Sequence, residues 1–205
     1  MTFLFFDTET TGLPRTFDAP VTDLSNWPRI VQLAWLLADE SGTTISQHCY
    51  TIRPQGFQIP EGLIHGISHA TALLHGKELH AVLDFFERGF LRRADRLIAH
   101  NYDFDAPVLG AEFLRAFGRN PVPTVAAHCT QKQTTDWAEI PNSKGPGNGR
   151  YKRPSLAELH RICGFGEIQN AHDALADTEA TAKCFFHIRQ HSPAVFYAPY
   201  KPARK

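Results

Sequence analysis

Two carboxylates at the end of an apolar segment, Asp7 and Glu9, form the first arrangement in the sequence that suggests chemistry. The segment from Phe3 to Phe6 is an unbroken apolar run, which predicts a short strand buried on both faces of a sheet. In an extended chain, alternate side chains point to the same face and lie about 6.6 Å apart along the strand. This spacing suits a pair of divalent ions held about 3.5–4 Å apart. The alternative is a polar strand end that runs into a Thr-Thr-Gly turn.

Two later segments add the further carboxylates and the base that such chemistry needs. Asp105 follows His100 and Asn101, and His172 precedes Asp177 by five positions. Four converging carboxylates would repel one another and raise each other's pKa, and divalent cations remove that repulsion. Oxygen ligands favour Mg²⁺ or Mn²⁺ over zinc.

The spacing of His172 and Asp177 predicts where the histidine lies. Five positions correspond to about 140° around an ideal helix, so the two side chains do not share a helix face. His172 is therefore expected in the loop or first turn before the helix, beside the acids. That position suits a general base that takes a proton from an attacking water. A surface histidine near a helix start is the alternative.

The elements that must position these residues alternate between strands and helices. We expect strands at 3–6, 29–38, 44–53, 96–99 and 123–128. We expect helices within 59–75, at 78–93, around Pro107 in a first turn and on to about Phe117, in the segment up to Trp137, at 155–162 and at about 173–190. A hairpin-linked start followed by parallel crossovers predicts an α/β fold with a mixed five-stranded sheet flanked by helices. The acids fall at strand ends, where such sheets bind ligands.

Length and composition predict a single domain. All 205 residues are assigned to it, with a core at about 3–190 and a short tail at 191–205. The 21 Lys and Arg balance the 21 Asp and Glu, which argues against a protein that coats nucleic acid through bulk positive charge. Four cysteines without a Cys-x-x-Cys pair and the lack of a transmembrane or signal-type segment predict a cytoplasmic protein with reduced thiols and no membrane partner.

One loop, residues 142–154, is clearly basic. It contains Lys144, Arg150, Lys152 and Arg153, three glycines and no acid. The hypothesis is that these cations grip the phosphates of a nucleic-acid strand next to the acids. The alternative is a loop at the surface without a binding role.

Three segments together resemble the motifs of the DEDDh 3′-to-5′ exonucleases. They are Phe6-Asp7-Thr8-Glu9-Thr10-Thr11-Gly12-Leu13, His100-Asn101-Tyr102-Asp103-Phe104-Asp105 and His172-Asp173-Ala174-Leu175-Ala176-Asp177. This family includes proofreading subunits of bacterial replicative polymerases, ribonuclease T and oligoribonuclease, all on a ribonuclease-H-like fold. The resemblance spans nearly the whole chain, and the three motifs occur in the family's order.

The resemblance implies a role for each matching residue. Asp7, Glu9, Asp105 and Asp177 would hold two Mg²⁺ or Mn²⁺ ions, and His172 would deprotonate the water that attacks the last phosphodiester. The backbone at Thr10 and the side chain of Leu13 would hold the terminal nucleotide, and Asn101 would orient the second motif. The product would be a nucleoside 5′-monophosphate.

The expected function is therefore a metal-dependent 3′-to-5′ exonuclease acting on single-stranded 3′ ends, with DNA favoured over RNA and a role in DNA repair or proofreading. Three alternatives stay open: a polymerase-associated nucleic-acid-binding module without catalysis, an RNA-trimming exoribonuclease, and a nuclease that cuts internally. A polymerase and a second copy of the chain, forming a homodimer, are the protein partners left open at this point.

Overall fold

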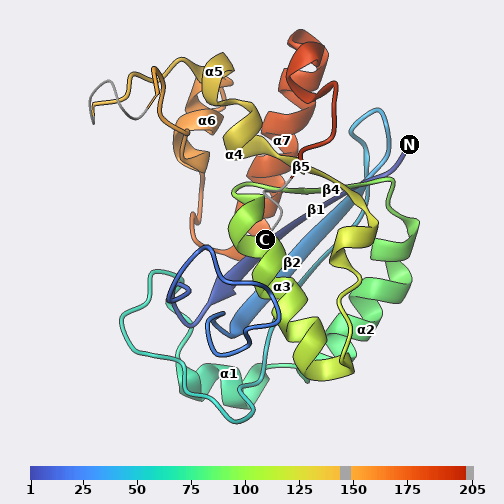
Figure 1. Ribbon diagram of the computed structural model, residues 1–205, viewed down its shortest axis with the longest axis vertical. Helices are drawn as coiled ribbons and strands as arrows, with labels where there is room; N and C mark the ends of the chain where they lie inside the picture. The colour runs from blue at the N-terminus through green and yellow to red at the C-terminus, as the bar shows by residue number, and fades with distance from the viewer. Residues whose placement is uncertain (144–148, 202–205) are drawn as a thin grey trace.

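Five strands form one mixed sheet at the centre of the protein (Figure 1). The structure is a computed structural model that describes residues 1–143 and 149–201. The strands are β1 (Phe3–Thr10), β2 (Ile30–Ala38), β3 (Thr44–Thr51), β4 (Arg96–Ala99) and β5 (Ala126–Cys129), in the spatial order β3-β2-β1-β4-β5. β1 pairs antiparallel with β2 and parallel with β4. The predicted fold class, a mixed five-stranded sheet flanked by helices, is confirmed.

The helices lie on both faces of the sheet. They are α1 (His69–His75), α2 (Leu79–Gly89), α3 (Tyr102–Phe117), α4 (Thr130–Gln133), α5 (Thr135–Ala138), α6 (Leu156–Ile162) and α7 (Ala174–His191). α3 crosses in front of the strands in Figure 1, and α7 passes behind them. The side chains on the two faces of β1 therefore pack against different helices.

Alternation along β1 divides its side chains between two hydrophobic clusters. Leu4 and Phe6 pack in the cluster that contains side chains of α2 and α3, whereas Phe3 and Phe5 pack in the cluster with α6 and α7. Because successive side chains of a strand point to opposite faces, this alternation also orients the polar end of β1. It directs Asp7 and Glu9 to the α7 face and the intervening Thr8 to the α3 face.

Helix starts match the sequence prediction where a local cap defines them. Ser155 and Glu158 form a capping box at the start of α6, and the Asp173 side chain accepts the N–H groups of Leu175 and Ala176 at the start of α7. The predicted starts at 155 and 173 therefore coincide with the observed N-caps.

The prediction that Pro107 lies in the first turn of α3 is wrong. The helix begins at Tyr102, so Pro107 lies in its second turn. Its start is set by Asn101, whose backbone is left-handed with φ 73° and whose carbonyl accepts the N–H of Phe104 at 2.8 Å. Asparagine tolerates this conformation better than most residues. Asp105 consequently lies within the first turn of a helix, and not in the loop before it.

Other boundaries differ in smaller ways. The helix expected at 78–93 ends at Gly89 and is followed by a 3₁₀ turn at Leu91–Arg93. The strand expected at 123–128 is β5 at Ala126–Cys129, because Val122–Thr124 form a 3₁₀ turn after Pro121. The region up to Trp137 divides into the two short helices α4 and α5.

The tail at 191–205 packs on the domain as far as the structure describes it. Phe196 is buried in the α7 cluster, and Tyr200 forms an antiparallel bridge to Ala127 on the edge strand β5. Tyr197, by contrast, is 91% exposed. The four cysteines are all free thiols. Within the described ranges, no helix combines the length and apolar character that crossing a membrane requires.

Candidate active site

The two acids of β1 lie on the face that α7 covers. Asp7 and Glu9 are both partly exposed, and Glu9 lies opposite Gln32 in the antiparallel register of β1 and β2. The register shifts between Glu9 and Thr10, which ends the regular ladder immediately after the second acid. The acids therefore lie where the central strand leaves the sheet.

Asp105 approaches from the opposite side of the sheet and is 3% exposed. Its Oδ1 accepts two hydrogen bonds from Thr8, one from the backbone N–H at 3.2 Å and one from Oγ1 at 2.7 Å. Thr8 thus uses the strand face that Asp7 and Glu9 do not. Repulsion from the Asp105 carboxylate raises the pKa of Asp7, so the two acids lie near each other.

The start of α7 brings the histidine and the fourth acid. His172 is exposed and lies in the loop before the helix, as predicted, with a left-handed backbone at φ 70°. Its backbone N–H donates to Oδ2 of Asp177 at 3.3 Å. This contact holds the loop against the first turn of α7, so that the His172 imidazole lies beside the Asp177 carboxylate.

Glu9, His172 and Asp177 form a group that could ligate a metal. Each offers one ligand atom, and these atoms all lie within 4.8 Å of one another. Within residues 1–143 and 149–201 this is the one such group of three or more. The carboxylate oxygens of Glu9 and Asp177 suit Mg²⁺ or Mn²⁺, whereas an imidazole nitrogen is a ligand more typical of transition metals such as zinc. Asp7 and Asp105, which were predicted to share the metal site, are not members of this group of three.

The electrostatics of the four acids also fit a cation site. Burial, followed by repulsion from Asp105, Asp177 and Glu9, raises the pKa of Asp7 well above its usual range. Burial and the same kind of repulsion raise the pKa of Glu9 to about 8. Such shifts mark carboxylates that lack a positive partner, and a bound cation supplies one.

The pKa values of the remaining two acids, Asp105 and Asp177, are raised as well. Burial raises the pKa of Asp105 to about 7, against the lowering effect of its hydrogen bonds from Thr8. Burial raises the pKa of Asp177 as well, and the His172 N–H and imidazole oppose that shift. Perturbed acids gathered at a strand end are typical of functional sites.

The residues predicted to hold the terminal nucleotide lie in the turn after β1. The Thr10 side chain is buried and its Oγ1 donates to the carbonyl of Gly12 at 2.7 Å. Gly12 has φ 143°, which favours glycine, and it turns the chain so that Leu13 is 75% exposed. Asn101 lies at the start of α3, four residues before Asp105. These positions are compatible with substrate contacts, and the contacts themselves stay predictions.

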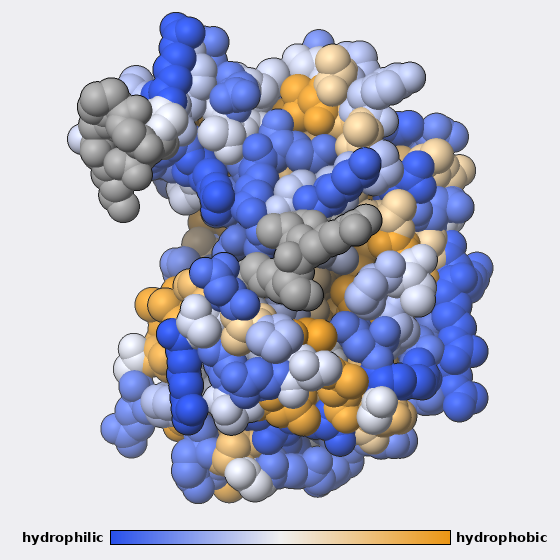
Figure 2. Space-filling model, viewed as in Figure 1, coloured by the Kyte–Doolittle hydropathy of each residue, from blue (hydrophilic) through white to orange (hydrophobic). Residues whose placement is uncertain are grey.

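The basic residues of 142–154 belong to a projecting segment, here called the arm and formed by residues 139–143 and 149–154. Its two sides pair through a bridge between Pro141 and Tyr151. Figure 2 shows a notch in the surface between the arm and the loops that follow β1 and β3, and β1 ends toward that side in Figure 1. The arm is therefore placed to contact a strand that enters the notch.

The four predicted cations of the arm differ in their surroundings. The Arg150 guanidinium lies 5.0 Å from the centre of the Tyr151 ring, and Lys152 pairs with Glu158 of α6 at 2.5 Å. Arg153 is exposed. Lys144 lies outside the described residues. Arg150 and Arg153 are consequently better placed for phosphate contacts than Lys152, whose charge is already paired.

Two residues that support the site were not predicted from the sequence. Thr8 holds Asp105, whereas Gln32, together with the predicted helix start at Asp173, holds the start of α7. Gln32 had a usable signal, since it is the one strongly polar residue in the apolar strand 30–38, and a buried amide requires hydrogen-bond partners. Thr8 carried no such signal, because threonine is common in strands.

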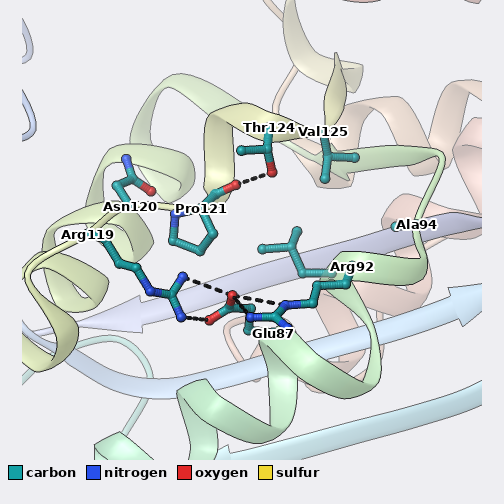
Figure 3. A pocket seen from close by; sticks show the side chains of 9 residues that line it. Glu87, Arg92, Ala94, Arg119, Asn120, Pro121, Thr124 and Val125 are labelled. Atoms are coloured by element: carbon teal, nitrogen blue, oxygen red, sulfur yellow. Dashed lines mark hydrogen bonds and ion pairs between the residues drawn. The ribbon is translucent and has the colours of Figure 1, made fainter.

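A separate cavity of about 560 Å³ lies at the opposite end of the sheet, near the starts of β4 and β5 (Figure 3). Its main polar feature is Glu87, whose carboxylate pairs with both Arg92 and Arg119 at 2.7–2.9 Å. These ion pairs satisfy the buried carboxylate and lower the pKa of Glu87. The cavity is remote from the acids of β1, and its charges are paired with one another.

Comparison with known protein families identifies the class to which this fold and site belong. The exonuclease family, described as RNase_T, matches residues 4–185, and the chain belongs to it. This membership confirms the resemblance to an exonuclease family and the enzyme class that it implied, an exonuclease. The fold family also implies dependence on a divalent metal. No curated protein matches the chain significantly in sequence.

Solved structures with the same fold include several of Escherichia coli exonuclease I. The complex with a dT13 oligonucleotide has a TM-score of 0.73 and 24% identity, and the complex with dA16 has a TM-score of 0.71 and 22% identity. A zinc-bound form of the E. coli enzyme with single-stranded DNA has a TM-score of 0.71 and 24% identity. Each match covers 96% of this chain and 42% of the exonuclease I chain. The chain thus spans less than half the length of these relatives.

Proposed function

We propose that the protein removes nucleotides from the 3′ ends of single-stranded DNA and releases nucleoside 5′-monophosphates. The observation that carries this proposal is the group of Glu9, Asp177 and His172, with ligand atoms within 4.8 Å of one another at the end of the central strand. Binding alone does not require a histidine beside converging acids. A family whose members are exonucleases supplies the reaction class.

Asp7, Glu9, Asp105 and Asp177 are proposed to hold two Mg²⁺ or Mn²⁺ ions. When bound, such ions offset the charge of the carboxylates and stabilise the negative charge that develops on the attacking and leaving oxygens. Thr8 supports this role for Asp105, because its two hydrogen bonds favour the ionised carboxylate. Asp177 has the same support from the backbone N–H of His172.

His172 is proposed to accept the proton of the attacking water. It is exposed, so it can meet water and substrate, and its backbone is held in place through Asp177. Leu13 and the backbone at Thr10 would hold the terminal nucleotide, with Asn101 beside them at the start of α3. The exposed apolar side chain of Leu13 supports this role, because it offers a surface against which a base can stack.

Preference for DNA over RNA is part of the proposal. The support is that related structures are described as complexes with dA16 and dT13 oligonucleotides. We further propose that residues 1–205 act as a single exonuclease domain in the cytoplasm, in DNA repair or proofreading, with a polymerase or a second copy of the chain as protein partner.

The arm is proposed to grip the phosphates of the strand behind the scissile bond. Each phosphate contact to a single strand contributes about 0.7 to the slope of log affinity against log salt concentration. Replacing Arg150 and Arg153 by alanine should therefore weaken binding and flatten that slope, whereas Lys152→Ala should act mainly on α6 through the loss of its Glu158 partner. An unchanged salt slope in the arginine variants would contradict the proposal.

The deciding experiment uses 5′-labelled single-stranded DNA and RNA of one sequence, incubated with the purified protein in Mg²⁺, Mn²⁺ or EDTA. We expect a metal-dependent ladder that shortens from the 3′ end, faster on DNA. His172→Asn and Asp177→Asn should abolish it, and Asp136→Asn, which changes an exposed acid on α5, should not. A faster reaction on RNA would favour the exoribonuclease, cleavage of circular DNA the internally cutting nuclease, and no ladder on either substrate the binding module.

A further inference from the structure

Gln32 is a buried amide that reaches from the sheet to the start of α7. It is 8% exposed and lies in β2 directly opposite Glu9. Its Oε1 accepts the backbone N–H of Ala174 at 2.9 Å, and its Nε2 donates to Oδ2 of Asp173 at 3.3 Å. Both groups of the amide are therefore used, and the identity of the two partners fixes the direction in which the amide points.

Gln32 and Asp173 together satisfy the free N–H groups in the first turn of α7. Backbone N–H groups at a helix start have no partner within the helix. The Ala174 N–H is bound by Gln32, whereas those of Leu175 and Ala176 are bound by Oδ1 of Asp173 at 3.1 and 3.2 Å. The rotation and height of this helix start are thus set by a contact with the sheet as well as by its own cap.

This contact couples the two halves of the site. Glu9 lies on β1, whereas His172 and Asp177 lie at the start of α7. These two elements are far apart in the sequence. Gln32 is paired with Glu9 across the β1–β2 ladder and bonded to the two residues that follow His172. A single rung of the sheet therefore positions both the acid of β1 and the helix that brings its partners.

We propose that Gln32 is a positioning residue of the exonuclease, which holds the start of α7 where His172 and Asp177 meet Glu9. The inference rests on the proposed function. An amide is required because a carboxylate at position 32 would face the Asp173 carboxylate without a proton to share, next to acids that already repel one another. An apolar side chain would leave the Ala174 N–H and one Asp173 oxygen without partners.

The reciprocal exchange of amide and acid tests this proposal. Gln32→Glu alone sets two carboxylates against each other, and Asp173→Asn alone sets two amide NH₂ groups against each other. In the double variant, the amide introduced at position 173 donates to the carboxylate introduced at position 32, and that carboxylate still accepts the Ala174 N–H. The helix also keeps its cap, because asparagine is as good an N-cap as aspartate. We expect each single change to lower kcat about 10- to 100-fold, as loss of a supporting hydrogen bond at a metal site does, and the double change to restore most of it.

Three further measurements separate positioning from general stability. KM for single-stranded DNA should stay unchanged, because Gln32 does not touch the strand. Hydrogen exchange of the Ala174 N–H should accelerate in Gln32→Met, which removes both bonds without adding charge and also serves if Gln32→Glu does not fold. Gln133→Glu is the matched control: its amide accepts from Cys129 N–H and donates to the Ala198 carbonyl, and its partners do not include the start of α7.

The outcomes distinguish the inference from the function on which it rests. An inactive wild-type protein would refute the proposed function. With an active wild type, single variants that keep full kcat, or a double variant no better than the worse single one, would overturn the role of Gln32. A kcat that falls equally in Gln133→Glu would do the same, since it would show a general response to the loss of a hydrogen-bonded amide.

Discussion

Replacing Thr8 by valine should weaken metal binding, and the effect should act only through Asp105. The change keeps the shape of the side chain and removes the hydroxyl that donates to Asp105 Oδ1 at 2.7 Å, while the backbone N–H bond at 3.2 Å remains. A hydrogen bond to a charged group contributes about 1.5–3 kcal/mol, and one pKa unit corresponds to about 1.4 kcal/mol. The pKa of Asp105, about 7 in the native protein, should therefore rise by about one to two units.

The size of the effect on metal binding follows from the ionised fraction of Asp105. At about pH 7 that fraction falls from about one half to between one tenth and one hundredth, because a ligand must lose its proton before it binds a cation. The Mg²⁺ concentration needed for half-maximal effect should rise about 5- to 50-fold. At about pH 9 at least about half of the carboxylate is ionised even in the variant, and the difference should shrink to about twofold or less.

The assay is a Mg²⁺ titration of the thermal unfolding temperature at both pH values, followed by the same titration of exonuclease rate. Thr178→Val is the matched control, since Thr178 is equally buried and loses a hydroxyl that donates only to the Ala174 carbonyl within α7. A Thr8→Val protein that needs no more Mg²⁺ than wild type at about pH 7, or a deficit that is equally large at about pH 9, would refute the reasoning.

Three further predictions concern stability. The pKa of Glu9 is raised to about 8 from 4.5, so between these pH values the folded metal-free protein holds a proton that the unfolded chain releases. The free energy of unfolding should therefore fall as pH rises from 4.5 to about 8. Urea titrations in EDTA should show a smaller fall for Glu9→Gln, and an equal fall would contradict this assignment to Glu9. The pKa of His100 is lowered to about 4 from 6.5 because its neutral ring is buried between the Thr130 hydroxyl and the Pro154 carbonyl, so its contribution is complete above pH 6.5 and should be lost as pH drops toward 4. His100→Gln should show a shallower acid loss in the same titration, and an unchanged acid slope would refute that assignment. Tyr200→Phe removes a hydroxyl that donates to Asp103, and it should cost about 1 kcal/mol in thermal or urea unfolding while kcat stays that of wild type; a large loss of activity would show that the tail does more than pack.

The sequence predicted those features that depend on neighbouring residues. β4 has the predicted bounds, and α6 and α7 begin at caps that Ser155 and Asp173 form with N–H groups two or three positions later. The position of His172 outside the α7 face also follows from local geometry. Each of these inferences uses residues within one or two helical turns.

Two of the features that escaped prediction depend on contacts between distant parts of the chain, and the third, the start of α3, depends on a local backbone conformation. Thr8 and Asp105 are 97 positions apart, and neither residue type indicates that the two form a hydrogen bond. The start of α3 is set by the left-handed backbone of Asn101, which overrides the usual preference of Pro107 for a first turn. Gln32 reaches a helix 142 positions away. Such contacts are selected by tertiary packing, which a periodic pattern does not encode.

The distribution of the site along the chain has a consequence for synthesis. Asp7 and Glu9 leave the ribosome with β1, whereas His172 and Asp177 emerge only after all five strands have been made. In the proposed mechanism hydrolysis uses both sets, so we expect the nascent chain to leave nucleic acid near the translating ribosome intact until α7 has emerged and docked on β1 and β2. Prematurely terminated or proteolysed products that lack α7 should likewise be inert as nucleases. The order of the elements along the chain thus delays nuclease activity until α7 has folded onto the sheet.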